Sequence, residues 1–337
     1  MGVCSIILAA GEGKRMKTGK PKVLSEVLFK PMVKWVVDAC ISSNIQEVCV
    51  VTGFEHKMVE DYLTKANIDC EFVYQEERKG TAHAVMSASS FLQKHLYDDV
   101  IILGGDSPFI DDVTIMDSYD MHLKANNAVT VISSEVDNPY GYGRIVRDSN
   151  KNLVSIEEEK DATEEIKKIK EVNSGAYWFK VSKLLSVLFD ISNHTAQGEY
   201  YLPDAIKLLL KHNENVGVFS AKSKEIVLGA NSLSELVYIN EIARKNKINK
   251  LIEQGVNIPC SDGILISDDT LIANGTTILP GTILTGKNYI GKECVIGPNT
   301  QLKDCVVEDY CNLNSIYSEG YEFKASEKIK PFSYVVL

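Results

Sequence analysis

Two glycines and two cations near the amino terminus have the types and spacing needed to bind a nucleotide. They lie in the segments LAAGEGKRM (8–16) and PKVL (21–24). Small residues let backbone N–H groups approach a phosphate or a base, and two cations can neutralise a triphosphate from two sides. The small residues are Ala9, Ala10, Gly11 and Gly13, and the cations are Arg15 and Lys22. A strand–helix turn with surface cations would explain the glycines alone, but the full pattern favours a phosphate loop.

The two common glycine-rich phosphate loops do not fit this segment. A P-loop needs a glycine five positions after its first one, where Met16 follows Gly11 and Thr18 follows Gly13. The dinucleotide-binding fingerprint also needs a glycine at the position of Met16. The loop therefore favours neither ATP hydrolysis nor hydride transfer.

The segments that must position this loop alternate between strand and helix patterns up to about residue 228. Runs at 47–53, 99–106 and 127–136 predict buried strands, and apolar residues at helical spacing predict a helix over 30–43, with Pro31 suited to its first turn. This alternation predicts a mainly parallel sheet with helices on both faces. Since ligands bind beyond the carboxyl ends of such strands, 11–22 and 104–106 are expected on one rim.

The period changes to six after a helix predicted over 234–255. Aliphatic residues then recur at Ile266, Ile272, Ile278, Leu284, Ile290, Ile296 and Leu302. Small residues lie two positions before all but the first of these, at Thr270, Thr276, Thr282, Asn288, Cys294 and Thr300. Neither a helix nor a simple strand has this period, whereas a parallel β-helix of hexapeptides does. The register blurs after residue 303, and the final stretch is expected to be irregular.

Composition and charge exclude several classes of protein. A chain of 337 residues predicts two domains, and its formal net charge of −10 argues against nucleic acid or an anionic membrane as the main partner. No apolar stretch approaches the roughly 20 residues of a membrane span, and the short amino-terminal apolar run is not a signal sequence. Eight scattered cysteines without a C-x-x-C pair indicate buried, reduced thiols. We expect a cytoplasmic protein.

Further motifs follow the loop along the chain. They are QEERKGTAHAV (75–85), GGDSPFI (104–110), GYGRIVRD (141–148), EEEKDAT (157–163), EVNSGAYWF (171–179), QGEYYLPDAI (197–206) and GANS (229–232). With the loop and the repeats, they resemble the sugar-phosphate nucleotidyltransferases, and among these the bacterial N-acetylglucosamine-1-phosphate uridylyltransferases. The resemblance covers essentially the whole chain.

This resemblance implies an α/β fold in three parts. Residues 1–228 would form a Rossmann-like nucleotidyltransferase domain with a mainly parallel mixed sheet. Residues 229–255 would form a linker helix, and 256–337 a short left-handed parallel β-helix. The implied assembly is a homotrimer formed through the β-helix.

The resemblance also assigns roles to individual residues. The implied nucleotide-binding residues are Leu8, Ala9, Ala10, Gly11, Gly13, Lys22, Gln75, Gly80 and Thr81. The implied sugar-phosphate ligands are Gly143, Glu158, Asn173 and Asn231, and the implied ligands of Mg²⁺ are Asp106 and Asn231. Arg15 and Lys22 would act in catalysis, on the departing β/γ-phosphates and on the α-phosphate respectively.

Several of these assignments have simpler alternatives. A lone aspartate after a strand, such as Asp106, is also a common helix cap, and Glu158 lies between two other acids. Glu199 and Tyr201 are further candidates near the sugar, and His83 is expected to be structural. Lys14, Gly104 and Pro203 depart from the family pattern.

The implied reaction is uridylyl transfer from UTP to N-acetylglucosamine 1-phosphate, for cell-envelope (peptidoglycan) precursor synthesis. The acetyltransferase activity of full-length family members needs a histidine in the β-helix, and all six histidines precede residue 213. That activity is therefore expected to be absent, which also disfavours a hexapeptide acyltransferase. Glucose 1-phosphate as the substrate, or a non-catalytic regulatory subunit, are the remaining alternatives.

Overall fold

The computed structural model describes residues 2–16, 19–193 and 198–336, apart from the side chain of Lys14. It divides into two compact units. The first comprises Met1–Ser25 and Pro31–Leu233, and the second comprises Glu26–Lys30 and Ser234–Leu337. The three-part division at 228 and 255 remains a prediction.

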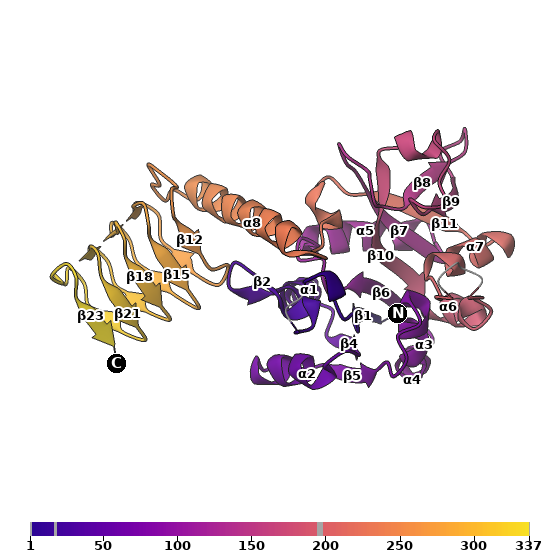
Figure 1. Cartoon of the computed structure of the whole chain (residues 1–337), viewed down its shortest axis with the longest axis horizontal. Helices are drawn as coiled ribbons and strands as arrows, with labels where there is room; N and C mark the ends of the chain where they lie inside the picture. The colour runs from indigo at the N-terminus through magenta and orange to yellow at the C-terminus, as the bar shows by residue number, and fades with distance from the viewer. Residues whose placement is uncertain (1, 17–18, 194–197, 337) are drawn as a thin grey trace. The chain divides into compact units, whose positions relative to one another are not determined.

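A mixed sheet with four adjacent parallel strands forms the centre of the first unit (Figure 1). The strands pair in the order β11-β7-β10-β6-β1-β4-β5. The parallel set is β6 (Asp99–Gly104), β1 (Val3–Ala9), β4 (Glu47–Thr52) and β5 (Glu71–Tyr74). The strands predicted at 47–53 and 99–106 are thus confirmed, and they end one and two residues earlier than expected, respectively.

The other half of the sheet contains antiparallel strands. β10 (Glu171–Lys180) runs antiparallel to both β6 and β7 (Val129–Glu135), and β11 (Val216–Ser220) runs parallel to β7. A hairpin of β8 (Arg144–Arg147) and β9 (Leu153–Glu157) joins β10 at Val172. The predicted mainly parallel mixed sheet is therefore confirmed.

Helices cover both faces of this sheet. They are α1 (Met32–Ser42), α2 (His56–Lys65), α3 (Thr81–Ser87), α4 (Ser89–Lys94), α5 (Asp112–Lys124), α6 (Val181–Leu188) and α7 (Pro203–Lys211). Successive strand residues enter different cores: Ile6 packs in the cluster with α3, α4, α6 and α7, and Ile7 in the cluster with α1, α2 and α5. Side chains of a strand alternate between faces, so a strand buried on both faces reads as a continuous apolar run. Short 3-10 turns lie at Lys14–Met16, Lys22–Leu24, Ile166–Lys168 and Glu225–Val227.

The second unit contains the long helix α8 (Leu233–Glu253) and a left-handed parallel β-helix (Figure 1). Its three sheets pair β12-β15-β18-β21-β23, β13-β16-β19-β22 and β14-β17-β20. The first sheet holds Leu265–Ile266, Ile283–Thr285, Gln301–Lys303, Tyr317–Glu319 and Tyr334–Val336. The second holds Leu271–Ile272, Tyr289–Ile290, Val306–Val307 and Glu322–Phe323, and the third Thr277–Ile278, Val295–Ile296 and Asn312–Leu313. A separate two-stranded sheet joins β2 (Glu26–Val27) and β3 (Lys30–Pro31).

Every predicted aliphatic position of the repeat is buried inside this β-helix, as are the small residues two positions before. The expectation of an irregular final stretch is wrong, because further coils continue to β23. Ile283 pairs with Gln301, 18 positions on (301 − 283), whereas Gln301 pairs with Tyr317, 16 positions on (317 − 301). Shorter turns break the period in the sequence without breaking the stacking of the strands.

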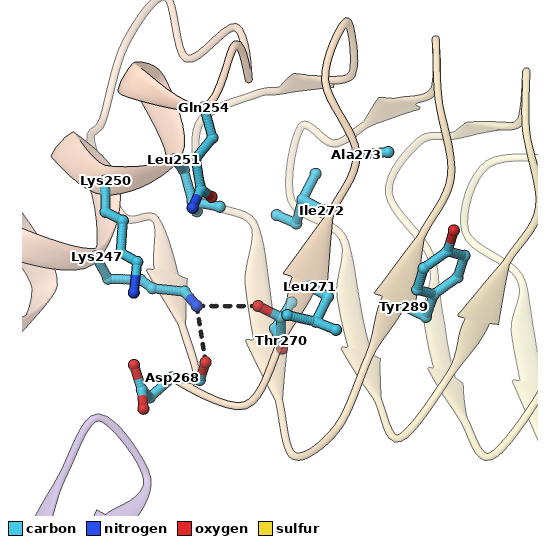
Figure 2. A pocket seen from close by; sticks show the side chains of 10 residues that line it. All are labelled: Lys247, Lys250, Leu251, Gln254, Asp268, Thr270, Leu271, Ile272, Ala273 and Tyr289. Carbon is cyan, nitrogen blue, oxygen red and sulfur yellow. Dashed lines mark hydrogen bonds between the residues drawn. The ribbon is translucent and has the colours of Figure 1, made fainter. Parts of the chain in front are cut away.

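A small hollow in the second unit lies between the end of α8 and the first coils of the β-helix (Figure 2). It has a volume of about 250 Å³ and contains none of the predicted site residues. Lys247 Nζ donates hydrogen bonds to the backbone oxygens of Asp268 (2.8 Å) and Thr270 (2.9 Å), as Figure 2 shows. Burial lowers the pKa of Lys247. Both carbonyls accept from this one ammonium group, so Lys247 joins α8 to the first coil.

Within the described part of the chain, no helix combines the length and the apolar character that crossing a membrane requires.

Candidate functional site

The predicted site residues of the first unit gather at one rim of its sheet. Gly11 follows β1, Gln75 follows β5 and Asp106 follows β6, and these strands are parallel. The antiparallel strand β10 pairs Tyr177 with Ile102 of β6, so Asn173, near its amino-terminal end, lies toward the same rim. Parallel strands with one antiparallel neighbour thus bring together motifs that are far apart in the sequence.

The glycine loop and Lys22 pack directly against each other. Gly13 has a φ of +66°, and a Cβ at that position would lie 2.6 Å from Lys22 Cβ. A Cβ on Gly11 would lie 3.4 Å from Lys22 Cε. The loop therefore needs glycine at position 13 both for its backbone conformation and for the passage of the lysine stem.

Backbone hydrogen bonds hold the start of the loop at the rim. Leu8 accepts from the N–H of Gly105 (2.9 Å), and Ala10 accepts from the N–H of Phe54 (3.2 Å). Ala9 and Ala10 are buried. A Cβ on Gly53 would lie 2.8 Å from Ala10 Cβ, so the chain packs closely at this end of β1.

Lys22 joins two acceptors from distant parts of the chain. Its Nζ donates to Asp106 Oδ2 and to Asn231 Oδ1, the latter at 3.2 Å. The side chains of Lys22 and Asp106 keep 19% and 21% exposure, so the group remains accessible. Gly229 lies close by, since a Cβ there would be 3.0 Å from the backbone oxygen of Asp106. Two oxygen acceptors, one a carboxylate and one an amide, therefore converge on a single positive charge.

Arg15 lies in the 3-10 turn Lys14–Met16 and is exposed. An arginine that binds a leaving group must be reachable from solvent, and Arg15 meets that condition. The side chain of Lys14, whose departure from the family pattern we noted, lies outside the described residues.

Gln75 and the Gly80–Thr81 turn form the second group of predicted residues. Gln75 is 3% exposed, and its Nε2 lies 3.3 Å from the backbone oxygen of Gly80 and 3.0 Å from His83 Nδ1. Thr81 Oγ1 accepts from the N–H of Leu202 (3.0 Å). Tyr200 N donates to Lys79 O, while Tyr200 O accepts from Ala82 N. The segment around Tyr200 therefore holds the turn in place.

Replacing Gly80 with alanine is expected to lower the free energy of unfolding by about 2 kcal/mol or more. The reason is a φ of +101° together with a Cβ that would lie 2.5 Å from the backbone oxygen of Tyr200. Urea unfolding measures the loss. Gly141→Ala is the matched control, because Gly141 has a φ of +87° and open space around its Cβ. Equal losses in both variants would contradict a role for the Tyr200 contact.

Gly143, Glu158 and Asn173 form the third group. A Cβ on Gly143 would lie 3.2 Å from Glu158 Oε1 and 3.6 Å from Asn173 Cβ. The N–H of Asn173 donates to the oxygen of Gly143 (2.8 Å), and Asn173 Nδ2 lies 2.7 Å from the Tyr177 hydroxyl. Of the three consecutive acids, Glu158 is the one that lies against Gly143. The resemblance selected the same residue, by its distance from Lys160 and Asp161 in the family pattern.

The neighbouring acid Glu159 has a different partner. Glu159 Oε2 accepts from Arg144 Nη2 (2.6 Å) and from the N–H of Gly141 (3.1 Å). These hydrogen bonds lower the pKa of Glu159, whereas burial raises the pKa of Glu158. Adjacent carboxyl groups thus have pKa values shifted in opposite directions.

Replacing Glu158 with glutamine is expected to stabilise the fold at neutral pH. Because burial raises the pKa of Glu158, its ionisation disfavours the folded state above the ordinary glutamate pKa of about 4.3. The neutral amide removes this penalty. Urea unfolding should show a gain in the free energy of unfolding at pH 7 that disappears below about pH 4.

Glu159→Gln is the matched control, with the opposite sign. The ionised Glu159 stabilises the fold above its unfolded-state pKa, and this stability is lost as the pH falls through its lowered folded-state pKa. The control is therefore expected to lose stability at pH 7 and to match the wild type in acid. A loss of stability at pH 7 in both variants would contradict the assignment of Glu158.

The segment containing Glu199 and Tyr201 also lies near this group. Burial and a hydrogen bond to Glu199 raise the pKa of Tyr201, and the charge of Glu158 adds to the effect. Pro203, another departure from the family pattern, is the first residue of α7, a position that suits proline. Gln197, the first residue of this motif, lies outside the described residues.

Sequence reasoning gave little weight to two residues of this region. We expect His83 to be structural, and its ring contacts the amide of Gln75. Arg144, 1% exposed, fixes Glu159 beside Glu158. The only sequence signal for His83 is its place in the GTAHA stretch, and Arg144 has no signal beyond its place next to Gly143.

Known proteins resemble this chain over most of its length. A family model described as "nucleotidyl transferase" matches residues 4–235. A protein of Caldanaerobacter subterraneus subsp. tengcongensis named "bifunctional protein GlmU" is 42% identical over 331 residues, covering 98% of this chain and 71% of the relative. The protein of the same name from Thermoanaerobacter pseudethanolicus is 40% identical over 334 residues, covering 99% and 72%.

One solved structure has the same fold as a large part of this chain. It is a crystal structure of a putative glucose-1-phosphate thymidylyltransferase from Bacillus anthracis in complex with a sucrose. It matches with a TM-score of 0.60 and 23% identity, covering 72% of this chain and 96% of that chain. At this identity the match supports the fold alone.

Proposed function

This chain belongs to the nucleotidyl transferase family and, within it, to the GlmU proteins, and from that premise we propose how its site works. The protein is a UDP-N-acetylglucosamine pyrophosphorylase. It transfers the uridylyl group of UTP to N-acetylglucosamine 1-phosphate and releases pyrophosphate. The observation that carries this function is the group of Lys22, Asp106 and Asn231 beside a glycine loop at the rim of the sheet.

The reaction needs charge neutralisation more than proton transfer. A phosphate oxygen of the sugar 1-phosphate attacks the α-phosphorus of UTP in line, and the bond from that phosphorus to the β-phosphate oxygen breaks. The nucleophile is already an anion, so no general base is required. Holding two polyanions together in the right orientation is the main task of the site.

Two cations serve the nucleotide's phosphates in this proposal. Lys22, whose stem packs against Gly13 and Gly11 at the rim, binds the α-phosphate. Arg15, exposed in its 3-10 turn, binds the β- and γ-phosphates and the departing pyrophosphate. A charged donor in place before the reaction needs little reorganisation in the transition state. Backbone groups of Leu8, Ala9, Ala10, Gly11 and Gly13 hold the nucleotide above the loop.

The family generally uses a divalent metal ion, and we propose that it is Mg²⁺ here. Asp106 and Asn231 would hold the ion, because their oxygens converge on one point, now taken by the Lys22 ammonium, and Mg²⁺ prefers hard oxygen ligands. When bound, such an ion neutralises charge on phosphate oxygens. Asn231 would also face the sugar phosphate.

The other two groups supply recognition. Gln75, Gly80 and Thr81 would bind the uracil, since a side-chain amide and backbone groups can pair with the polar edge of a base. Gly143, Glu158 and Asn173 would bind the acetamido and hydroxyl groups of the sugar. Close packing of Gly143 against Glu158 and Asn173 supports this grouping.

Pyrophosphate release from a panel of nucleotides and sugar 1-phosphates tests the function. We expect release with UTP and N-acetylglucosamine 1-phosphate, and less with glucose 1-phosphate or with other nucleoside triphosphates. Absence of pyrophosphate with every pair would overturn the proposal in favour of a non-catalytic subunit.

We also propose that this stretch of chain carries no acetyltransferase activity, although its relatives are named bifunctional. Residues 213–337 contain no histidine that could act as a base. An assay with acetyl-CoA and glucosamine 1-phosphate tests this directly, with release of the free thiol as the readout. Thiol release that depends on glucosamine 1-phosphate would overturn it.

We propose a homotrimer formed through the β-helix. The support is a row of exposed apolar residues in register on one sheet, Leu271, Tyr289 and Val306. Light scattering coupled to size-exclusion chromatography should give three times the 37.4 kDa mass of the chain. A mass equal to that of one chain would contradict the proposal.

A further inference from the structure

The amide of Gln75 has its nitrogen and oxygen fixed by its surroundings. Gln75 follows β5, and its backbone N–H donates to the oxygen of Thr52 (2.8 Å). Its Nε2 has two hydrogens and two acceptors, the Gly80 oxygen at 3.3 Å and His83 Nδ1 at 3.0 Å. A backbone oxygen can only accept, so the Gly80 contact alone identifies Nε2 as the atom on that side.

This orientation determines the state of His83. Because both hydrogens of Gln75 Nε2 point to acceptors, His83 Nδ1 must be without a proton, and the ring proton is on Nε2. His83 lies in the first turn of α3, and its backbone oxygen accepts a hydrogen bond from Ser87 Oγ (2.9 Å). The centroid of its ring lies 6.2 Å from the centroid of the Tyr200 ring.

The remaining polar atom of the amide is Gln75 Oε1, which can only accept. Among the described residues, the structure records no hydrogen bond to it, although the residue is 97% buried (3% exposed). Gln75 Oε1 is not among the fully buried atoms without a partner, so this acceptor of fixed direction can be reached by a ligand that carries a donor.

We propose that His83 is a positioning residue that holds Gln75 Oε1 toward the base and so selects uracil over cytosine. The proposal rests on the proposed function, in which Gln75 binds the base. The middle of the uracil edge is N3–H, a donor between two acceptors, whereas N3 of cytosine is itself an acceptor. Gln75 Oε1 accepts a hydrogen bond from N3–H of uracil and repels the unprotonated N3 of cytosine. An amide free to rotate by 180° would serve both bases, and His83 together with Gly80 prevents that rotation.

The test compares two variants of His83 by kcat/KM for UTP and for CTP. His83→Leu removes the acceptor, and we expect the UTP/CTP ratio to fall about tenfold, mainly through KM for UTP. His83→Asn keeps an acceptor oxygen near the position of Nδ1, and its ratio should return to within about threefold of the wild type. A ratio unchanged in His83→Leu, or equally reduced in both variants, would overturn the proposal.

Two measurements on the wild type complete the test. The ¹⁵N chemical shifts of the His83 ring identify which nitrogen carries the proton, and a proton on Nδ1 would overturn the proposal even if the leucine variant fails to fold. Calorimetric binding of UTP and CTP gives the base preference without turnover. A wild type that binds UTP but releases no pyrophosphate overturns the proposed function alone, whereas an active wild type whose base preference ignores His83 overturns this inference alone.

Discussion

Replacing Lys22 with alanine is expected to lower kcat about 10³-fold while the protein stays folded. The stem of Lys22 packs against Gly13, and its Nζ contacts Asp106 and Asn231. An ion held by Asp106 and Asn231 would leave the Lys22 ammonium to the α-phosphate, and alanine removes that positive charge. The measurement is steady-state pyrophosphate release, with thermal melting to check the fold.

Two variants control for charge and geometry. Lys20→Ala removes a nearby exposed cation and should keep kcat near the wild-type value. Lys22→Arg keeps the charge but changes the shape of the donor, so it should recover only part of the loss. A Lys22→Ala enzyme within about threefold of the wild-type kcat would refute the assignment.

Replacing Asp106 with asparagine is expected to lower kcat by about 10²- to 10³-fold. The side chain keeps its shape but loses its charge, which removes both the partner of Lys22 and the anionic oxygen proposed to hold a divalent ion. Rates measured over a titration of magnesium chloride should show that the variant needs a higher concentration of the ion. Chelation of divalent ions should abolish the wild-type rate.

The matched control is Asp111→Asn, a carboxylate on the same segment after β6. Asp111 caps α5 by accepting from the N–H of Thr114 (2.6 Å), and asparagine caps a helix equally well. This variant should keep both its melting temperature and its activity. An Asp106→Asn enzyme with the same rate and magnesium dependence as this control would show that Asp106 is only a structural partner of Lys22.

Features that depend on residues close together in the sequence were predictable. The glycine loop has Met16 and Thr18 at positions where two known phosphate-binding motifs require glycine. These two residues alone argue against ATP hydrolysis and hydride transfer. Helix α1 followed from apolar residues at helical spacing, and the β-helix from its period of six. These patterns reflect which face of one element is buried, and that is a local property.

The tertiary structure decided how distant segments meet. It placed Asn231 against Lys22 across 209 positions, and His83 against the amide of Gln75. It also carried the β-helix past residue 303, where shorter turns hide the period. Pairing register, turn length and amide orientation depend on contacts between segments that are far apart in the sequence. The sequence of one such segment does not show which other segment it will contact. The sequence therefore determined the kinds of residue that form the site, and only the fold decided which of them lie together.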